Sequence, residues 1–185
     1  MPNGQLLSKA ITAIQEQQPA RAIAILEKRL ASHPVDSAAW HYLGIACAAA
    51  GNFIAAIPAL NKSLELAPEN TFFQENYLIT LYNDQQYQEV VAFFQGKDNE
   101  WLQKPAIQLI LASSQLKAGL LPEALKVALS LLERDRALVE AWRITGNVQR
   151  TLGQLSAAQS AFNQVLALEP AKPANYAMLA ELYAR

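Results

Sequence analysis

The sequence predicts an all-α solenoid, a stack of helical hairpins, because it repeats itself every 34 residues. Gly119 and Gly153 stand 34 residues apart, and Gly51 precedes Gly119 by twice that distance. Three prolines share another phase of the same period: Pro34, Pro68 and Pro170. The chain is rich in Ala and Leu with only 8% aromatic residues, a composition that suits closely packed helices better than strands. Such stacks present long concave surfaces and seldom carry an active site.

The bulk properties narrow the class of protein. The chain has 185 residues, 52% of them hydrophobic, enough to bury a sizeable core. A net charge of -1 and an isoelectric point near 6.1 give no electrostatic footprint for nucleic acid or anionic lipid. The N-terminus lacks a basic start followed by an apolar run, and no stretch reaches about 18 consecutive apolar residues. We therefore expect a cytoplasmic protein without a membrane span.

Placing the prolines at the thirty-second position divides the chain into residues 3–36, 37–70, 71–104, 105–138 and 139–172, with a partial repeat at 173–185. Each full repeat is predicted to hold two helices joined by a turn near its fifteenth position. Five residues occupy that position: Gln17, Gly51, Gln85, Gly119 and Gly153. Glycine suits a left-handed helix C-cap, and proline after the second helix stops it. We expect these repeats to form a single domain.

The first repeat is weak in its first helix, where Leu6, Ala10 and Ala13 stand at core positions, as is common for a terminal repeat. The second repeat is the clearest. One face of its first helix holds Trp40, Leu43, Gly44 and Cys47. The face of the second helix that should pack against it holds Ala56, Leu60 and Ser63. The small residue Gly44 predicts that the two helices cross closely at this position.

The third repeat is degenerate. Leu78 stands where a small residue is expected, and Val90 replaces the alanine of the other repeats. The segment from Gly96 to Glu100 reads as a turn that ends the second helix early. We expect Trp101 to pack back as a plug. The fifth repeat returns to the regular pattern with Trp142, Gly146, Ala158 and Phe162.

These residues resemble the tetratricopeptide repeat (TPR), whose signature is W-x2-L-G-x2-Y, then A-x3-F, then P. The second repeat supplies Trp40, Leu43 and Gly44, then Ala56, then Pro68. The likeness extends from Asn3 to the end of the chain. It implies a right-handed superhelix of five hairpins plus a final helix, acting as a non-catalytic scaffold for protein partners.

Motifs for catalysis or metal binding are missing from the sequence. It has no Gly-rich phosphate loop, HExxH, CxxC or G-x-S-x-G, and Cys47 is its single cysteine. His33 and His41 lie on different elements without acidic or cysteine neighbours at ligand spacing. We interpret His33 as a turn residue, His41 as a polar residue facing the groove, and Cys47 as a small buried hydrophobe. No catalytic residue, metal or cofactor is expected.

The resemblance also implies where a partner would bind. In TPR proteins the first helix of each repeat lines the concave groove, and contacts fall at its second, fifth, ninth, twelfth and thirteenth positions. Carried onto this sequence, the groove residues are His41, Phe72, Ile79, Tyr82, Asn83, Leu109, Ser113, Leu116, Lys117, Arg143, Asn147 and Arg150. The apolar ones favour a buried peptide or helix of a protein partner. The alternative is that the repeats bury these hydrophobes internally.

Arg143, Asn147 and Arg150 form one stripe of one helix. Two guanidinium groups beside an amide could hold a carboxylate or another anion. The alternative is a solvated charged face in which Glu140 neutralises Arg143.

The last helix carries an apolar stripe of Tyr176, Leu179 and Tyr183, with no second helix of its repeat before Arg185. This predicts either self-association through the stripe or a longer protein. In the latter case the chain is an N-terminal region of a larger enzyme, since TPR arrays often precede catalytic domains such as sulfotransferases and glycosyltransferases.

Overall fold

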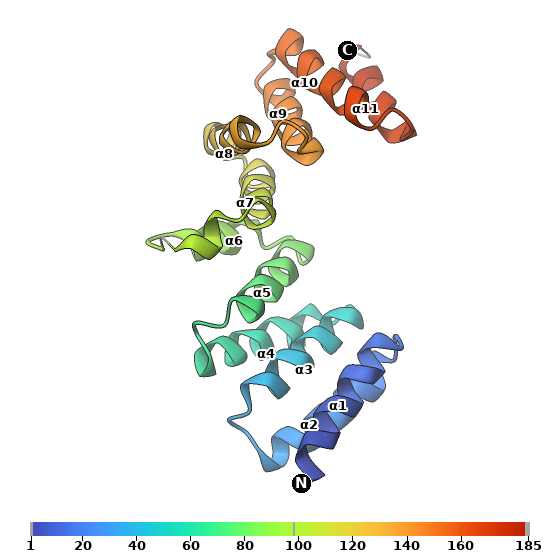
Figure 1. Cartoon of the computed structure of the whole chain (residues 1–185), viewed down its shortest axis with the longest axis vertical. Coiled ribbons are helices and arrows are strands. Elements are labelled where there is room, and N and C mark those ends of the chain that lie inside the picture. The colour runs from blue at the N-terminus through green and yellow to red at the C-terminus, as the bar shows by residue number, and fades with distance from the viewer. Residues whose placement is uncertain (1, 98, 184–185) are drawn as a thin grey trace. The chain divides into compact units, whose positions relative to one another are not determined.

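The computed structural model describes residues 2–97 and 99–183, and the side chains of residues 5–97 and 99–182. The described residues form eleven α-helices and one 3-10 helix (Figure 1). These are α1 (Pro2–Gln15), α2 (Pro19–Ser32), α3 (Ser37–Ala49), α4 (Phe53–Leu66), α5 (Thr71–Asn83), α6 (Tyr87–Phe94), η1 (Glu100–Gln103), α7 (Pro105–Lys117), α8 (Leu121–Arg134), α9 (Val139–Thr151), α10 (Leu155–Leu168) and α11 (Pro173–Tyr183). Within these residues, no helix has the length and apolarity that a membrane crossing requires.

The helices follow the 34-residue period closely. The first helices α3, α5, α7, α9 and α11 begin at the residues where the sequence places the repeat starts: Ser37, Thr71, Pro105, Val139 and Pro173. The five turn residues at the fifteenth position all have positive φ: Gln17 (57°), Gly51 (75°), Gln85 (60°), Gly119 (79°) and Gly153 (74°). The predicted left-handed C-caps are therefore confirmed, including the two positions that hold glutamine.

Each first helix from α3 onward is also tied to the end of the preceding repeat by a side chain at its fourth position. In α3, Trp40 Nε1 donates to the Pro34 carbonyl oxygen at 2.7 Å. In α9, Trp142 Nε1 donates to the Arg136 carbonyl oxygen at 2.9 Å. Gln74, Gln108 and Tyr176 make the equivalent bond in α5, α7 and α11, each to the carbonyl six residues back. The bond satisfies a backbone acceptor beyond the end of the second helix and fixes the entry of the next helix.

The two helices of a regular repeat cross at a glycine, as the sequence predicts. An added Cβ at Gly44 would lie 2.5 Å from Leu60 Cγ and 3.0 Å from the Ala56 carbonyl oxygen. At Gly146 an added Cβ would collide with the Phe162 ring. The close approach lets Leu60 and Phe162 become completely buried. Cys47 is buried, as expected, and burial together with the nearby Glu27 raises the pKa of its thiol.

The third repeat departs from this plan where the sequence predicts it should. Helix α6 ends at Phe94, and Gly96 takes a φ of +69°. Asn99 then caps η1 through a bond from the Leu102 backbone amide to its Oδ1 at 3.1 Å. Trp101 and Leu102 are both buried, so the predicted plug is confirmed. Asp98, inside the predicted turn, lies outside the described residues.

The chain divides into two compact units, Met1–Gln86 and Tyr87–Arg185. The boundary falls between α5 and α6, inside the degenerate third repeat. In the first unit, α1 to α4 share a core that includes Ala22, Leu26 and Leu43. The second unit has cores around Ala128 and Ile144, around Leu131 and Leu132, and around Phe162. That all six repeats act as a single domain stays a prediction.

Candidate functional site

The most exposed large hydrophobes among the predicted groove residues lie on α5. Phe72 is 54% exposed and Ile79 is 39% exposed, although both are large apolar side chains. They are seven residues apart and so lie on the same side of the helix, with the half-buried Tyr82 further along. Asn70 fixes the start of the helix by accepting from the Phe73 backbone amide at 3.2 Å. Asn83, at the end of the helix, is exposed.

The same side of the first unit is apolar from one repeat to the next. The ninth repeat position holds Ile11 in α1, Ile45 in α3 and Ile79 in α5. Helix α3 contacts both α1 and α5, so the three isoleucines stand on neighbouring helices. Ile11 and Ile45 are half-buried. We call the residues Ile11, Ile45, Phe72 and Ile79 the apolar face of the first unit.

His41 does not belong to this exposed face, contrary to the sequence-based prediction. Its side chain is completely buried, and its ring stacks on Phe73 with the centroids 4.2 Å apart. Phe72 and Tyr42 lie at 5.1 and 5.3 Å from the same ring. Burial lowers the pKa of His41 from 6.5 to about 4, so the ring is neutral near pH 7. His41 is thus part of the packing between α3 and α5.

The predicted groove residues of α7 are divided between core and surface. Leu109 and Leu116 are half-buried and pack against the cores of the second unit. These two leucines are thus partly covered by the repeats themselves, which is the alternative to a partner-facing role that the sequence allowed. Ser113 is half-buried, and Lys117 is exposed at the end of the helix.

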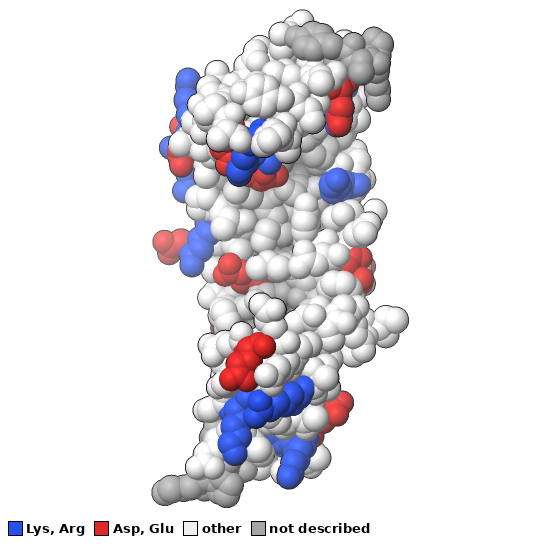
Figure 2. Space-filling model, turned by 90° about the vertical axis from the view of Figure 1, so that its right-hand side faces the viewer, with Lys and Arg blue, Asp and Glu red and all other residues white. Residues whose placement is uncertain are grey.

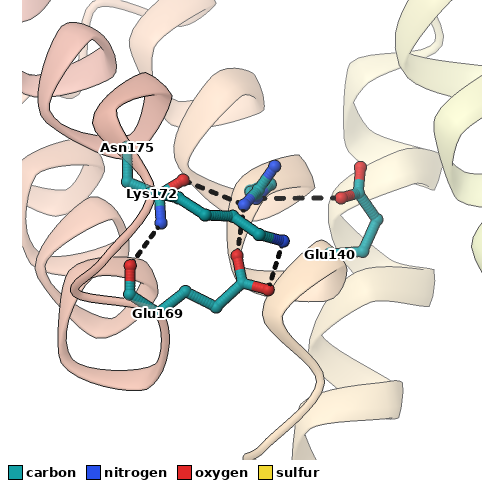
Figure 3. Close-up of polar contacts among 5 residues, drawn as sticks. Glu140, Glu169, Lys172 and Asn175 are labelled. Atoms are coloured by element: carbon teal, nitrogen blue, oxygen red, sulfur yellow. Dashed lines mark hydrogen bonds and ion pairs between the residues drawn. The ribbon is translucent and has the colours of Figure 1, made fainter.

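Arg143 on α9 is held by side chains of its own chain (Figure 3). Its Nη2 donates to Glu169 Oε2 at 2.6 Å and to Asn175 Oδ1 at 2.9 Å. Lys172 Nζ donates to the other carboxylate oxygen of Glu169 at 2.6 Å, and Glu140 stands 3.8 Å from Arg143 Nε. In Figure 3, Glu169, Lys172 and Asn175 lie close together, and Glu140 stands apart from them. The bond from Lys172, with the charges of Lys172 and Arg143, lowers the pKa of Glu169.

Arg150 and Asn147 are also paired. Arg150 Nη1 donates to Glu181 Oε2 on α11 at 2.7 Å, and Arg150 Nη2 donates to Asn147 Oδ1 at 3.0 Å. Both arginines of the stripe therefore bind carboxylates of this chain. That the stripe holds an anion of a partner stays a prediction. Sequence reasoning named the neighbouring Glu140 and missed Glu169, Asn175 and Glu181. Glu169 ends the repeat that contains Arg143, and Asn175 and Glu181 belong to the following one, so only their distance of 26 to 38 residues downstream of Arg143 could have signalled them.

On α11, the predicted apolar stripe is partly exposed. Tyr176 is 55% exposed, while Leu179 packs against the core around Phe162 and Leu182. The side chain of Tyr183 lies outside the described side chains. Self-association through this helix remains a prediction.

Comparison with known proteins identifies the family. The family model of the tetratricopeptide repeat matches residues 7–71 and 109–175, well over half of the chain. The chain belongs to the tetratricopeptide repeat family. The unmatched residues between the two segments, 72–108, contain most of the degenerate third repeat.

Solved structures share the fold at low sequence identity. MamA of Desulfovibrio magneticus RS-1, in a structure from its residue 41 to the end, superposes with a TM-score of 0.80 at 15% identity, covering 92% of this chain and 97% of that one. A TPR protein of Parabacteroides merdae gives 0.84 at 15% identity, covering 98% of this chain and 72% of that one. YrrB, described as a TPR protein with an unusual peptide-binding site, gives 0.79 at 15% identity, covering 95% and 90%. No curated protein matches the sequence.

The described part of the chain offers no set of three or more His, Cys, Asp or Glu residues arranged to hold a metal ion. The candidate site is the apolar face of the first unit, because it exposes Phe72 and Ile79, and the paired arginines of α9 form a separate polar feature.

Proposed function

We propose that this TPR protein is a non-catalytic interaction scaffold that binds an apolar segment of a partner protein on the apolar face of the first unit. The observation that carries the proposal is the exposure of Phe72 and Ile79 on a first helix. Moving a side chain of this size from full exposure to full burial is worth about 1.5–3 kcal/mol, and these two are about half exposed, so a partner that covers them gains roughly half of that from each. Family resemblance supports the location, since first helices line the binding groove of TPR proteins.

The scarcity of charge around this face favours an apolar ligand. From Ser37 to Asn61 the sequence has no Lys, Arg, Asp or Glu, and α5 contributes only Glu75. Figure 2 shows one side of the molecule, on which charged side chains gather toward the upper and lower ends and are few across the middle. An acidic or basic peptide would find little to pair with here. A segment with apolar residues at regular spacing, either extended or helical, fits better.

The neighbour YrrB is a TPR protein described as having a peptide-binding site, which adds support by analogy of fold. We include Tyr82 and Asn83 at the end of α5 as polar contacts that orient the bound segment. The predicted contributions of Leu109 and Leu116 are smaller, because both side chains already pack against their own cores.

The test is selection of short random peptides displayed on phage against the purified chain, followed by affinity measurement on the selected peptides. We expect apolar consensus positions and at least a tenfold loss of affinity in the Ile79→Asp variant. Ile54→Asp is the matched control, because Ile54 is 91% exposed but lies on the second helix α4. Circular dichroism checks that both variants fold. Equal binding by wild type and Ile79→Asp, or an equal loss in Ile54→Asp, would contradict the proposal.

A further inference from the structure

A pocket on the second unit lies away from the polar stripe of α9. Leu129, Leu132 and Glu133 at the end of α8, Arg136 in the following turn and Trp142 on α9 line a space of about 260 Å³. Trp142 points about 100° around α9 from Arg143, because successive residues of a helix are separated by that angle. The pocket therefore opens to a different side of the unit from the position that TPR ligands usually contact.

The inner part of this pocket, formed by Trp142, Leu132 and the turn between α8 and α9, is held in place. Trp142 Nε1 donates to the Arg136 carbonyl oxygen, which holds the indole ring and satisfies its one polar group. Leu132 belongs to the core beneath the pocket. The turn is held by bonds from the Asp135 amide to the Leu131 carbonyl at 2.9 Å and from the Ala137 amide to Asp135 Oδ1 at 2.8 Å. The part of the wall that Trp142 and Leu132 form costs little to bind against, because these side chains need not reorganise.

The repeat fold does not require an apolar residue at the mouth of the pocket. Leu129 is 42% exposed, and the same repeat position holds only polar residues elsewhere: Glu27, Asn61, Gln95 and Asn163. The indole of Trp40 makes the same bond to the Pro34 carbonyl as Trp142 makes to Arg136. Around Trp40, however, Glu27 and Pro34 stand where the fourth repeat has Leu129 and Arg136. An exposed leucine and an exposed arginine thus distinguish this place from its equivalent in the first repeat.

The rim carries one charge of each sign. Glu133 and Arg136 are both exposed, and no other described side chain forms an ion pair or hydrogen bond with either charged group. The cavity is smaller than the range of about 300–1,000 Å³ that is usual for drug-sized ligands. One large side chain is a better match for this volume. A basic and an acidic neighbour on the ligand would match Arg136 and Glu133.

We propose that this pocket is a second binding site, which takes a single large apolar side chain of a partner peptide flanked by one acidic and one basic residue. The site is independent of the apolar face of the first unit. Its chemistry is that of an anchor pocket, where burial of one side chain gives affinity and the charged rim selects the flanking residues.

The experiment records the indole N–H resonances of the full chain by NMR during titration with short peptides. The probes are Ac-Lys-Phe-Glu-amide, its reverse Ac-Glu-Phe-Lys-amide, and the neutral Ac-Ser-Phe-Ser-amide. Trp142→Phe assigns the resonance of Trp142. We expect a saturable shift of that resonance, with Trp40 and Trp101 unmoved, and at least threefold tighter binding of one charged peptide than of the neutral one.

Leu129→Glu introduces the residue that the first repeat has at this position, so it should fold, and it should weaken binding at least tenfold. Ile54→Glu is the matched control, and Ile79→Asp should leave this binding unchanged, which separates the pocket from the proposed function. The proposal is overturned if Trp142 does not shift, if Trp40 shifts equally, or if Leu129→Glu binds as wild type does. If the neutral peptide binds as tightly as both charged peptides, Glu133 and Arg136 do not select the flanking residues. A shift of Trp142 with protein concentration alone would instead identify a second copy of the chain as the occupant.

Discussion

At the scale of single residues, His41 is the least expected feature of the first unit. Neither of its ring nitrogens has a hydrogen-bond partner in the described structure, and the ring stacks on Phe73 with the tilted ring of Phe72 beside it. A buried polar group without a partner costs free energy, because it has lost its bonds to water. The stacking with Phe73 offsets part of this cost.

His41 should make stability depend on pH. Its pKa is about 4 in the folded chain and 6.5 without burial, so between these values the unfolded chain binds a proton that the folded chain does not. The free energy of unfolding should therefore fall as the pH falls through this window. The expected loss is about 3 kcal/mol, from about 1.4 kcal/mol per unit of pKa shift. His41→Phe should remove it, as measured by urea unfolding at several pH values. Parallel profiles for wild type and variant would refute this assignment.

Gln85 holds a backbone conformation that favours glycine. Its φ is +60° at a turn position that Gly51, Gly119 and Gly153 occupy in other repeats. The left-handed region costs a residue with a Cβ about 1–2 kcal/mol, and glycine avoids this at some entropic cost. Gln85→Gly should therefore raise the free energy of unfolding by about 0.5–1 kcal/mol. The reverse change, Gly119→Gln, should lower it by a similar amount in the same urea titration. A less stable Gln85→Gly variant would contradict the argument.

At the scale of helices, stability depends on close crossings within hairpins and on ties between repeats. The Arg143 network is such a tie, since it joins α9 to the residues before α11 and to α11 itself. Because Glu169 accepts from both Arg143 and Lys172, loss of its charge would weaken two bonds at once. Inside a hairpin, the close crossings at Gly44 and Gly146 hold the two helices of a repeat together.

Gly146→Ala tests the crossing of α9 and α10. Helix propensity alone would stabilise the variant by about 1 kcal/mol. The added Cβ would instead meet the buried Phe162 ring, so we expect a net loss of about 1–3 kcal/mol in thermal or urea unfolding. In a Phe162→Ala background the ring is gone, and Gly146→Ala should then stabilise the chain. If Gly146→Ala stabilises the wild-type chain, the crossing is looser than the contacts indicate.

At the scale of the whole molecule, each repeat contacts mainly its neighbours, and the two compact units have separate cores. In arrays of this kind stability is nearly a sum of repeat and neighbour terms, so a local defect stays partly local. The degenerate third repeat contains the boundary between the units and most of the segment that the family model leaves unmatched.

Leu26→Ala should reveal how far the units are coupled. Leu26 is completely buried in the core of the first unit, and its truncation should cost about 2–5 kcal/mol. We expect hydrogen exchange, followed by mass spectrometry, to accelerate in α1 to α4 and to change little in α7 to α10. Equal acceleration in both units would show that the chain unfolds as one cooperative body.

The sequence by itself determined the repeat and its local geometry. The 34-residue period located every first helix from α3 onward and the left-handed turns at Gln17 and Gln85. These features depend on hydrogen bonds and dihedral angles within a few residues, which local patterns encode. The position of Phe72 and Ile79 on one side of α5 also follows from a local pattern, their spacing of seven residues.

Only the tertiary structure decided which of the predicted groove residues are free. His41 is buried because Phe73 of the next repeat stacks on it, and Arg143 and Arg150 are engaged because Glu169 and Glu181 come from further along the chain. The anchor pocket beside Trp142 likewise combines α8 with α9. A helical pattern in the sequence shows on which face of the helix a side chain lies. The neighbouring repeat determines whether that side chain contacts solvent, a hydrophobic core or a residue of opposite charge.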